Sequence, residues 1–311
     1  AISLQTNHMA FLADRFELLR PIGRGGMAEV WAARDVGTDR AVAVKSVRGA
    51  RDATAADRLR REASVTASIA HPGVVGVYGV EDHRDRTFMV MDLLPGRDLS
   101  NVLADGPLPL PRTLNLVRGI AQTLDAVHQA GVVHGDVKPS NVMVAGERTT
   151  LIDFGIASDS SGHGDGPRYG TTASMAPELI RAEPVTPATD MYGLGCLIFE
   201  ALTGGPMFPL DSPEVAMRHH AHGTPPRLSE SLIGAPARLD ALVHQLLAKD
   251  PAGRPSAAET WERLGDLLRA PAVRLQSAPL PAARVSPRPH LDPEGTQPML
   301  AAEPAWLDDA A

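Results

Sequence analysis

Short strands dominate the first part of the chain. Apolar and β-branched residues recur in brief runs that are separated by turn residues such as Gly37. Five of these runs are expected as strands: residues 16–20, 30–34, 40–45, 74–80 and 87–91. Residues 51–70 instead carry Leu59 and Ala63 at helical spacing, so one helix interrupts the series. The first three strands are expected to form an antiparallel meander.

The pattern after Pro95 is mostly helical. Apolar residues recur every three to four positions in four further segments. These expected helices span residues 110–130, 190–202, 236–247 and 257–268. The predicted fold class is therefore α+β, in which a small antiparallel β lobe with one main helix precedes a larger, mostly α-helical lobe.

Both ends of the chain differ from the part between them. Residues 1–8 show no pattern that joins them to the strands beyond, and we interpret them as a remnant of cloning. From Ala270 onward prolines are frequent and periodic apolar residues are almost absent. This composition predicts a disordered, partly polyproline II tail over residues 270–311.

Composition excludes several classes of protein. With 311 residues, of which 43% are hydrophobic and 22% charged, the chain is expected to be globular and to form two lobes. Its net charge of -7 provides no basic surface for a phosphate backbone, so no nucleic-acid partner is expected. The one cysteine, Cys196, can form neither an internal disulfide nor a cysteine zinc site, which suits a reducing compartment.

Hydropathy predicts the cellular location of the protein, and the ratio of arginine to lysine indicates the kind of organism it comes from. No apolar run approaches the roughly 18 to 20 residues that span a bilayer, so no membrane contact is expected from this segment. The expected location is the cytoplasm, either for the whole protein or for the intracellular part of a longer membrane-anchored chain. Only three of the 30 Lys and Arg residues are lysines, which indicates a GC-rich bacterial source, and an actinobacterium is expected. Each lysine is therefore informative, because Arg and Lys are not interchangeable.

A glycine-rich turn lies between two of the expected strands, from Ile22 to Val30. Glycines at such a place let backbone N–H groups approach phosphate oxygens without interference from a Cβ atom. An ordinary hairpin turn explains the same residues about equally well when they are taken alone. A strand rather than a helix follows, so the turn is not a Rossmann fingerprint, and no Gly-Lys-Ser/Thr occurs for a Walker A loop.

Lys45 ends an apolar strand, and by itself it would be interpreted as a solvated lysine. Glu62 changes this interpretation, because it lies near the buried face of the expected helix and requires a cation there. Arg58, four residues earlier, is the ordinary partner for Glu62, and Lys45 is the functional alternative.

Polar residues concentrate in one loop between apolar strands, at residues 134–141. This loop carries Asp136, Lys138 and Asn141. A base for a hydroxyl proton, a cation for a migrating phosphoryl group and an amide for Mg²⁺ would use all three side chains. Asp153 follows the next apolar strand and is expected to be a second metal ligand, although an Asp-Gly turn remains the alternative.

In this order and spacing the motifs resemble the protein kinase family, specifically bacterial serine/threonine kinases of the eukaryotic-like, or Hanks, type. The resemblance covers about residues 16–268. It rests on the Gly-rich loop, Val-Ala-Val-Lys at 42–45, His-x-Asp-x-Lys-x-x-Asn at 134–141, Asp-Phe-Gly at 153–155 and Ala-Pro-Glu at 176–178. It implies a kinase domain over 14–269, with a small lobe at about 14–91, a hinge at 92–96 and a large lobe at 97–269.

The resemblance implies that the protein transfers the γ-phosphate of ATP to serine or threonine hydroxyls of proteins, with autophosphorylation expected. Asp136 would accept or orient the substrate hydroxyl, Lys138 would steady the γ-phosphate, and Thr171 would lie near both. Asn141 and Asp153 would hold Mg²⁺ between the β- and γ-phosphates, with Mn²⁺ as an alternative ion.

The resemblance also implies a set of residues around ATP. Lys45, paired with Glu62, would bind the α- and β-phosphates, while Met91 would be the gatekeeper and residues 92–94 the hinge that meets the base. The residues expected to contact ATP are Ile22, Gly23, Gly25, Gly26, Val30, Ala43, Lys45, Met91, Asp92, Leu94 and Asp153.

Further residues are expected to support the site and its partners. By resemblance, Asp190 braces the catalytic loop, and Glu178 pairs with Arg254. The partners that the resemblance implies are protein substrates and a second copy of the chain itself, with which a homodimer would form through the small lobe.

Three positions depart from the family pattern. Ala28 replaces the third glycine of the phosphate loop, a small change that should cost little. Ser174 stands where an aromatic residue commonly shapes the pocket beside the phosphoacceptor. Gly135 replaces the arginine that binds an activation-loop phosphate, so activity is expected to depend less on phosphorylation of the serines at 158–161.

Two alternatives come from other classes. His-Gly-Asp at 134–136 also occurs in small-molecule phosphotransferases similar to aminoglycoside and choline kinases, although Asp-Phe-Gly and the segment at 170–178 resemble a protein-substrate platform. A pseudokinase scaffold that binds nucleotide and recognises partners is the other alternative. Nothing in the sequence favours it, because every residue that the chemistry needs is present.

Overall fold

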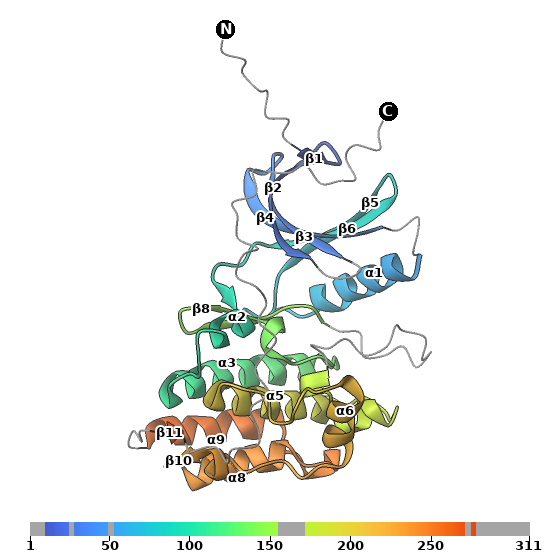
Figure 1. Cartoon of the computed structure of the whole chain (residues 1–311). Coiled ribbons are helices and arrows are strands. Elements are labelled where there is room, and N and C mark those ends of the chain that lie inside the picture. Colours follow the sequence, from blue (N-terminus) through green and yellow to red (C-terminus); the bar gives the residue numbers. More distant parts are fainter. Residues whose placement is uncertain (1–9, 25–27, 49–52, 155–171, 271–274, 278–311) are drawn as a thin grey trace. The chain divides into compact units, whose positions relative to one another are not determined.

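The computed structural model describes residues 10–24, 28–48, 53–154, 172–270 and 275–277. By their contacts, these residues form two compact units. Unit 1 comprises the described residues up to Ala67 together with Gly76–Leu94. Unit 2 comprises Ser68–Val75 and the described residues from Pro95 onward. Figure 1 labels most elements of both units.

Unit 1 contains a six-stranded antiparallel sheet, whose strand order is β1-β2-β3-β4-β6-β5. The strands are β1 (Ala10–Leu12), β2 (Phe16–Arg24), β3 (Glu29–Asp35), β4 (Arg40–Arg48), β5 (Val77–His83) and β6 (Arg86–Asp92). Strands β2, β3 and β4 are neighbours in space as in sequence (Figure 1), which confirms the predicted meander.

Apolar residues at alternate positions of these strands form the core of unit 1. Phe16 and Phe88 meet edge to face, with ring centroids 5.8 Å apart. They belong to a cluster that also contains Leu12, Leu18, Trp31, Ala33, Val42, Val44 and Val90. Full burial of each large apolar side chain contributes about 1.5–3 kcal/mol, so this cluster stabilises the strands on either side of the glycine-rich loop.

Helix α1 (Ala53–Ala67) packs against the sheet through mostly small residues. Its buried positions share one face at helical spacing: Ala55, Ala56, Leu59, Ala63 and Thr66. The helix contacts β4, β5 and β6. Glu62 precedes Ala63 on this side of the helix, and its carboxylate therefore reaches a side chain of β4.

Three boundaries in the first part of the chain differ from the prediction. The strand expected at 74–80 is β5 at Val77–His83, because Val74 instead forms a parallel bridge with Leu151. For the same reason Ser68–Val75, expected in the small lobe, groups with unit 2. Strand β1 was not predicted, and it begins before residue 14, the expected start of the domain.

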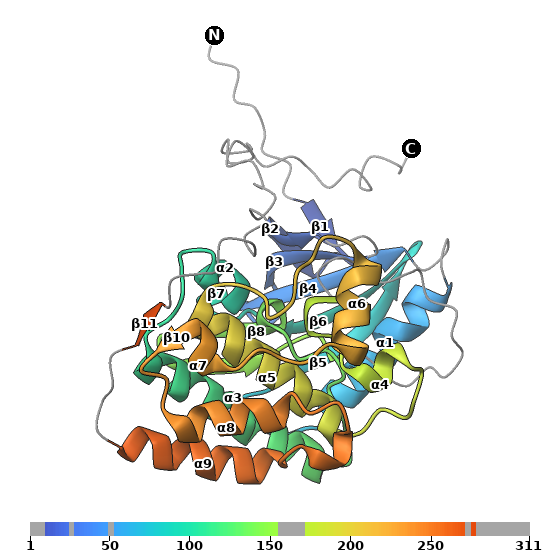
Figure 2. The ribbon, with the colours of Figure 1, turned by 60° about the horizontal axis from the view of Figure 1, so that its bottom comes forward.

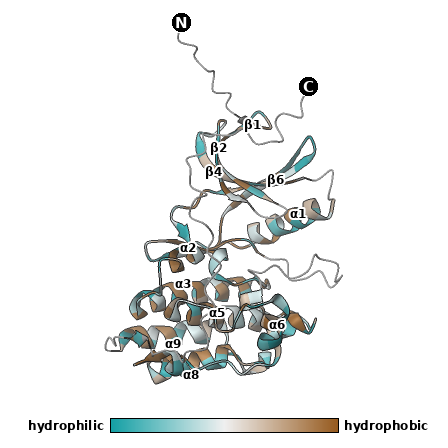
Figure 3. Ribbon diagram, in the orientation of Figure 1, coloured by the Kyte–Doolittle hydropathy of each residue, from teal (hydrophilic) through white to brown (hydrophobic). Residues whose placement is uncertain are grey.

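Four long helices form the centre of unit 2: α3 (Leu110–Gln129), α5 (Pro187–Thr203), α8 (Ala237–Leu246) and α9 (Ala257–Arg269). Helix α3 contacts both α5 and α9, and α8 contacts α5 and α9 (Figures 1 and 2). Hydrophilic and hydrophobic residues alternate along α8 and α9 (Figure 3), as expected for helices with one face in the core. All four helices were predicted from their periodicity.

Helix α5 begins earlier than the predicted Asp190. Pro187 occupies its first turn, and Thr186 and Thr189 form a reciprocal capping box. Gly204 ends the helix with a positive φ of 81°, a backbone conformation that glycine adopts without a Cβ penalty. These two caps therefore determine where α5, the helix that carries Asp190, begins and ends.

Shorter elements complete unit 2. They are β7 (Arg97–Asp98), α2 (Leu99–Leu103), β8 (Val142–Ala145), β9 (Arg148–Leu151), α4 (Pro177–Ile180), α6 (Pro213–His222), α7 (Leu228–Ser231), β10 (Leu232–Ile233) and β11 (Gln276–Ser277). Strand β11 pairs with β10 and lies within the segment predicted as a disordered tail. The prediction is wrong at this point, because a pairing between distant segments leaves no local periodicity. In the described ranges no helix has both the length and the apolar character to cross a membrane.

Gly193 on α5 lies against the loop that carries the candidate catalytic residues. A Cβ atom at Gly193 would lie 2.5 Å from the carbonyl oxygen of Val137. We expect Gly193→Ala to lower the free energy of unfolding by about 1–3 kcal/mol, since backbone must move to accept the methyl group. Gly205→Ala is the matched control, because nothing lies within 4 Å of a Cβ atom there. Urea unfolding of both variants tests this, and equal stabilities would contradict it.

Candidate active site

Unit 1 carries the strands on either side of the glycine-rich loop. Gly23 of β2 pairs with Val30 of β3, and Val30 pairs with Lys45 of β4. The loop residues Gly25 and Gly26, both predicted to contact ATP, lie outside the described residues. The sheet register therefore places the start of β3, which follows this loop in sequence, next to Lys45 within β4 (Arg40–Arg48).

Lys45 forms a bidentate contact with Glu62 of α1. The ammonium Nζ lies 2.7 Å from one carboxylate oxygen and 2.9 Å from the other. Each side chain is only 14% exposed, so the ion pair is largely shielded from water. Of the two cations considered for Glu62, the structure thus shows Lys45 in contact with its carboxylate.

The other residues of unit 1 predicted to enclose the base differ in exposure. Ala43 and Met91 are buried and pair with each other across β4 and β6. Val30 is half-buried, whereas Ile22 is 40% exposed. Asp92 and Leu94, in the expected hinge, are half-buried. The structure brings Ala43 and Met91 together, and their role towards a nucleotide stays a prediction.

Unit 2 carries the polar loop of residues 134–141. The Lys138 ammonium lies 2.6 Å from the Asp136 carboxylate. The Asn141 amide Nδ2 donates to the Asp136 carboxylate at 3.0 Å and to the Asp136 backbone carbonyl at 2.9 Å. The Asp136 side chain keeps 27% exposure and that of Lys138 keeps 15%. The loop thus holds a carboxylate in place and leaves part of it open to a reactant.

The buried carboxylate of Asp190, on α5, binds the backbone of this loop. Asp190 accepts the backbone N–H of His134 at 2.9 Å and that of Gly135 at 2.7 Å. His128 Nε2 lies 2.8 Å from the same carboxylate, whose side chain is fully buried. Gly135 has a φ of +77°, which glycine adopts readily and other residues rarely do. The predicted brace by Asp190 is therefore present.

His134 connects the loop to the strand that leads to Asp153. Its Nδ1 accepts the backbone N–H of Asp136 at 3.2 Å, which leaves Nε2 to donate to the Ile152 carbonyl at 3.1 Å. The imidazole is fully buried and packs against Phe154, with ring centroids 4.6 Å apart. These contacts hold Asp136 and Asp153 to one scaffold.

Asn141 and Asp153 fit the donor set of a hard divalent cation. Because Asn141 Nδ2 donates to Asp136, the amide oxygen, which accepts only a long contact of 3.4 Å from the Ser140 hydroxyl, is the atom that suits a metal ion. Asp153 supplies a carboxylate from a backbone with a φ of 54°. The described residues contain no group of three His, Cys, Asp or Glu side chains suited to a metal ion. Two protein oxygens completed by phosphate oxygens and water are the ligand pattern that Mg²⁺ prefers.

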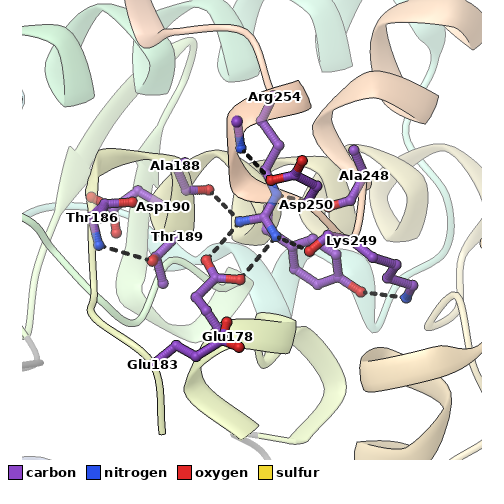
Figure 4. A network of polar contacts seen from close by, with 12 residues as sticks. Glu178, Glu183, Thr186, Ala188, Thr189, Asp190, Ala248, Lys249, Asp250 and Arg254 are labelled. Atoms are coloured by element: carbon purple, nitrogen blue, oxygen red, sulfur yellow. Dashed lines mark hydrogen bonds and ion pairs between the residues drawn. The ribbon is translucent and has the colours of Figure 1, made fainter. Parts of the chain in front are cut away.

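A second buried ion pair lies at the Ala-Pro-Glu segment (Figure 4). The Arg254 guanidinium donates to both Glu178 oxygens, at 2.6 and 2.9 Å, and to the carbonyl of Ala188 at 2.8 Å. Burial would raise the pKa of Glu178, but the contact with Arg254 holds that pKa below its usual value. The predicted pairing is present, and it joins α4 to the first turn of α5 and to the segment before α9.

Lys249 extends the network around Arg254. Its ammonium donates to the His220 carbonyl at 2.7 Å and lies 3.3 Å from the Tyr192 hydroxyl. Burial, with a further contribution from nearby Arg254, lowers the pKa of Lys249 to about 8. This third lysine of the chain therefore joins α6 to α5 and takes no part in the loop of residues 134–141.

Some residues of the site carried no usable signal in the sequence. His128 and Gly193 were not predicted, since a histidine near the end of a helix and a glycine within one have many explanations. Only the tertiary contact with Asp190 and with Val137 gives them a role. Thr171 was predicted as a site residue and lies outside the described residues.

Comparison with known families agrees with this geometry. The family model described as protein kinase domain matches residues 16–263. The chain therefore belongs to the protein kinase family, and the predicted α+β fold of two lobes is confirmed.

Curated relatives narrow the similarity to bacterial serine/threonine-protein kinases. PknB of Mycolicibacterium smegmatis is 36% identical, over 96% of this chain and 48% of its own length. A serine/threonine-protein kinase of Streptomyces coelicolor is 39% identical, over 80% of this chain and 39% of its own. PknH of Mycobacterium bovis is 33% identical, over 98% of this chain and 55% of its own length. The chain thus spans about half the length, or less, of these relatives, and the predicted bacterial Hanks-type resemblance is confirmed.

The buried pair of Glu178 and Arg254 is expected to be critical for stability. Arg254→Met leaves a buried carboxylate without its cation, which should cost about 3–5 kcal/mol of unfolding free energy. Arg227→Met is the control, because Arg227 lies 3.6 Å from Asp240 with 42% of its side chain exposed. That variant should lose less than about 1 kcal/mol.

Urea unfolding at neutral pH measures both losses. The double variant Arg254→Met with Glu178→Gln should recover part of the loss, since no uncompensated charge then remains buried. Equal stabilities of Arg254→Met and Arg227→Met would contradict this account of the pair.

Proposed function

We propose that this chain contains an active serine/threonine protein kinase domain, which transfers the γ-phosphate of ATP to serine and threonine hydroxyls of proteins. The observation that carries the proposal is the arrangement of Asp136, Lys138 and Asn141 on a loop held by Asp190. The shielded pair of Lys45 and Glu62 supports it from unit 1. Membership of the protein kinase family agrees with both.

The roles of the loop residues follow from their chemistry. The partly exposed Asp136 carboxylate orients the substrate hydroxyl and takes its proton as the new oxygen–phosphorus bond forms and ADP leaves. Asn141 Nδ2 holds this carboxylate in place. The Lys138 ammonium, 2.6 Å from Asp136, balances the negative charge that gathers on the transferred phosphoryl group.

Unit 1 would bind the nucleotide. Lys45, oriented by Glu62, would bind the α- and β-phosphates, and the hinge backbone at residues 92–94 would meet adenine beside Met91. The family uses ATP with a divalent metal ion. Asn141 and Asp153 would hold that ion, for which Mg²⁺ is proposed and Mn²⁺ is the alternative, and it would neutralise charge on the phosphates.

The two alternatives are less well supported. A small-molecule phosphotransferase would share the loop chemistry, but the buried contact of Glu178 with Arg254 supports the Ala-Pro-Glu segment expected beside a protein substrate. A pseudokinase scaffold has no need for a carboxylate that is held by Asn141 and still 27% exposed.

Asp136→Asn is the decisive variant. It keeps the size of the side chain and removes the proton acceptor, so phosphotransfer should fall by about 10²–10⁴-fold while ATP binding stays within a few-fold. The assay is incubation with γ-labelled ATP, a divalent cation and a generic protein substrate, followed by mapping of the labelled residues. Asp125→Asn, on the outer part of α3, is the matched control and should keep full activity.

The results separate the candidate functions. Label on serine or threonine that is lost in Asp136→Asn supports the kinase, whereas transfer only to small hydroxylated molecules would favour the alternative phosphotransferase. Bound ATP without any transfer would favour the scaffold. The Asp136→Asn protein can also serve as substrate for the wild type, and its labelling would show transfer between copies, as expected if two chains pair through the small lobe inside the cell.

Gly135 suggests how the activity is controlled. The family's arginine at this place binds a phosphate on the activation loop, and here a glycine with its N–H bonded to Asp190 offers no cation. We expect the triple variant Ser158→Ala, Ser160→Ala and Ser161→Ala to keep its turnover within about threefold of the wild type. Loss of nearly all turnover in the steady-state assay would contradict this expectation.

A further inference from the structure

A three-residue cluster surrounds Asp92, the residue at which β6 ends and the expected hinge begins. The Asp92 carboxylate accepts the Tyr78 hydroxyl at 2.5 Å through one oxygen and the Gly76 N–H at 3.0 Å through the other. The Asp92 N–H in turn donates to the Gly76 carbonyl at 2.9 Å. Both the side chain and the backbone of Asp92 are therefore held by β5 and the residue before it.

Tyr78 reaches Asp92 because the pairing of β5 with β6 is irregular. Val77 pairs with Met91, but Gly79 pairs with Val90, so Tyr78 is an extra residue on β5. Such a bulge redirects a side chain that regular alternation would place elsewhere. The irregularity lies opposite Met91, the expected gatekeeper, and so it is located beside the segment that would bind the base.

Two further observations show that this arrangement is specific. A Cβ atom at Gly76 would lie 2.5 Å from the Asp92 carboxylate, so only glycine leaves room for the contact. The Arg40 guanidinium lies 5.1 Å from the centroid of the Tyr78 ring. The hydrogen bond to Asp92 raises the pKa of Tyr78 above its usual value, since a neighbouring carboxylate disfavours the loss of the phenol proton.

We propose that Tyr78 and Gly76 are positioning residues for nucleotide binding, which hold Asp92 so that the backbone of residues 92–94 is ordered before adenine arrives. The proposal rests on the proposed kinase function, in which this backbone meets the base. The Asp92 side chain is occupied by Tyr78 and Gly76, so Asp92 would contribute to nucleotide binding through its backbone. An ordered hinge lowers the cost of binding, because its conformational freedom is already lost.

Tyr78→Phe removes only the hydroxyl group and is the first variant to test. The KM for ATP and the dissociation constant for ADP with Mg²⁺ should rise about three- to tenfold, the loss expected for one ordinary hydrogen bond. The kcat and the KM for the protein substrate should stay unchanged. Gly76→Ala, which displaces the Asp92 carboxylate, should give the same result. Combining both variants should add little, because they act through one group.

The control is Thr38→Val in the turn that joins β3 to β4 of the same sheet. Asp35 accepts the Thr38 hydroxyl at 3.0 Å and the Gly37 N–H at 3.0 Å, which is the same pattern of bonds far along the chain from the hinge. This variant loses an equivalent hydrogen bond and should keep the ATP affinity of the wild type. If Tyr78 had a purely structural role, Tyr78→Phe and Thr38→Val would have the same affinity for ATP.

The outcomes separate this inference from the kinase function. An active wild type whose ATP affinity is unchanged by Tyr78→Phe would overturn the inference and leave the function in place. A fall in kcat without a rise in KM, or an equal rise in Thr38→Val, would overturn it as well. A wild type that neither binds ATP nor transfers phosphate would overturn the proposed function, and the inference with it.

Discussion

The buried carboxylate of Asp190 is the constraint on which the loop of residues 134–141 depends. A buried charge is costly unless it is hydrogen-bonded, and Asp190 obtains its donors from the backbone of His134 and Gly135 and from His128. The path of the loop is thereby determined two residues before Asp136. Gly193, one turn further along α5, lets the helix approach closely enough for these bonds to form.

Burial distinguishes the ion pair of Glu178 and Arg254 from those for which a chemical role is proposed. Glu178 and Arg254 are almost completely buried and have no access for a ligand. Lys45 and Glu62 keep 14% exposure each, and Asp136 keeps 27%. The Asp136 carboxylate thus remains partly open to solvent, while the Asp190 carboxylate, which binds the backbone of the same loop, is fully buried. The attraction between Lys45 and Glu62 is screened little by salt, because the pair is mostly shielded from water. Glu62 therefore orients the Lys45 ammonium although neither side chain is completely buried.

Much of the fold could be predicted because it follows from the local periodicity of apolar residues along the chain. The meander of β2, β3 and β4 and the four long helices follow from alternation and from helical spacing. Val74 and β11 could not be placed in this way, because their partners, Leu151 and β10, lie far along the chain. A pairing between distant segments depends on tertiary contacts and not on the pattern of the segment itself.

The sequence by itself determined the fold class and the family, and it indicated the residues for which a chemical role is proposed, because motif spacing is preserved whatever the surrounding contacts are. It also narrowed the partner of Glu62 to two cations. The tertiary structure decided that this partner is Lys45, that His128 supports Asp190, and that the bulge at Tyr78 reaches Asp92. Each of these choices depends on which side chains meet across strands or helices, and such distances are properties of the folded chain alone.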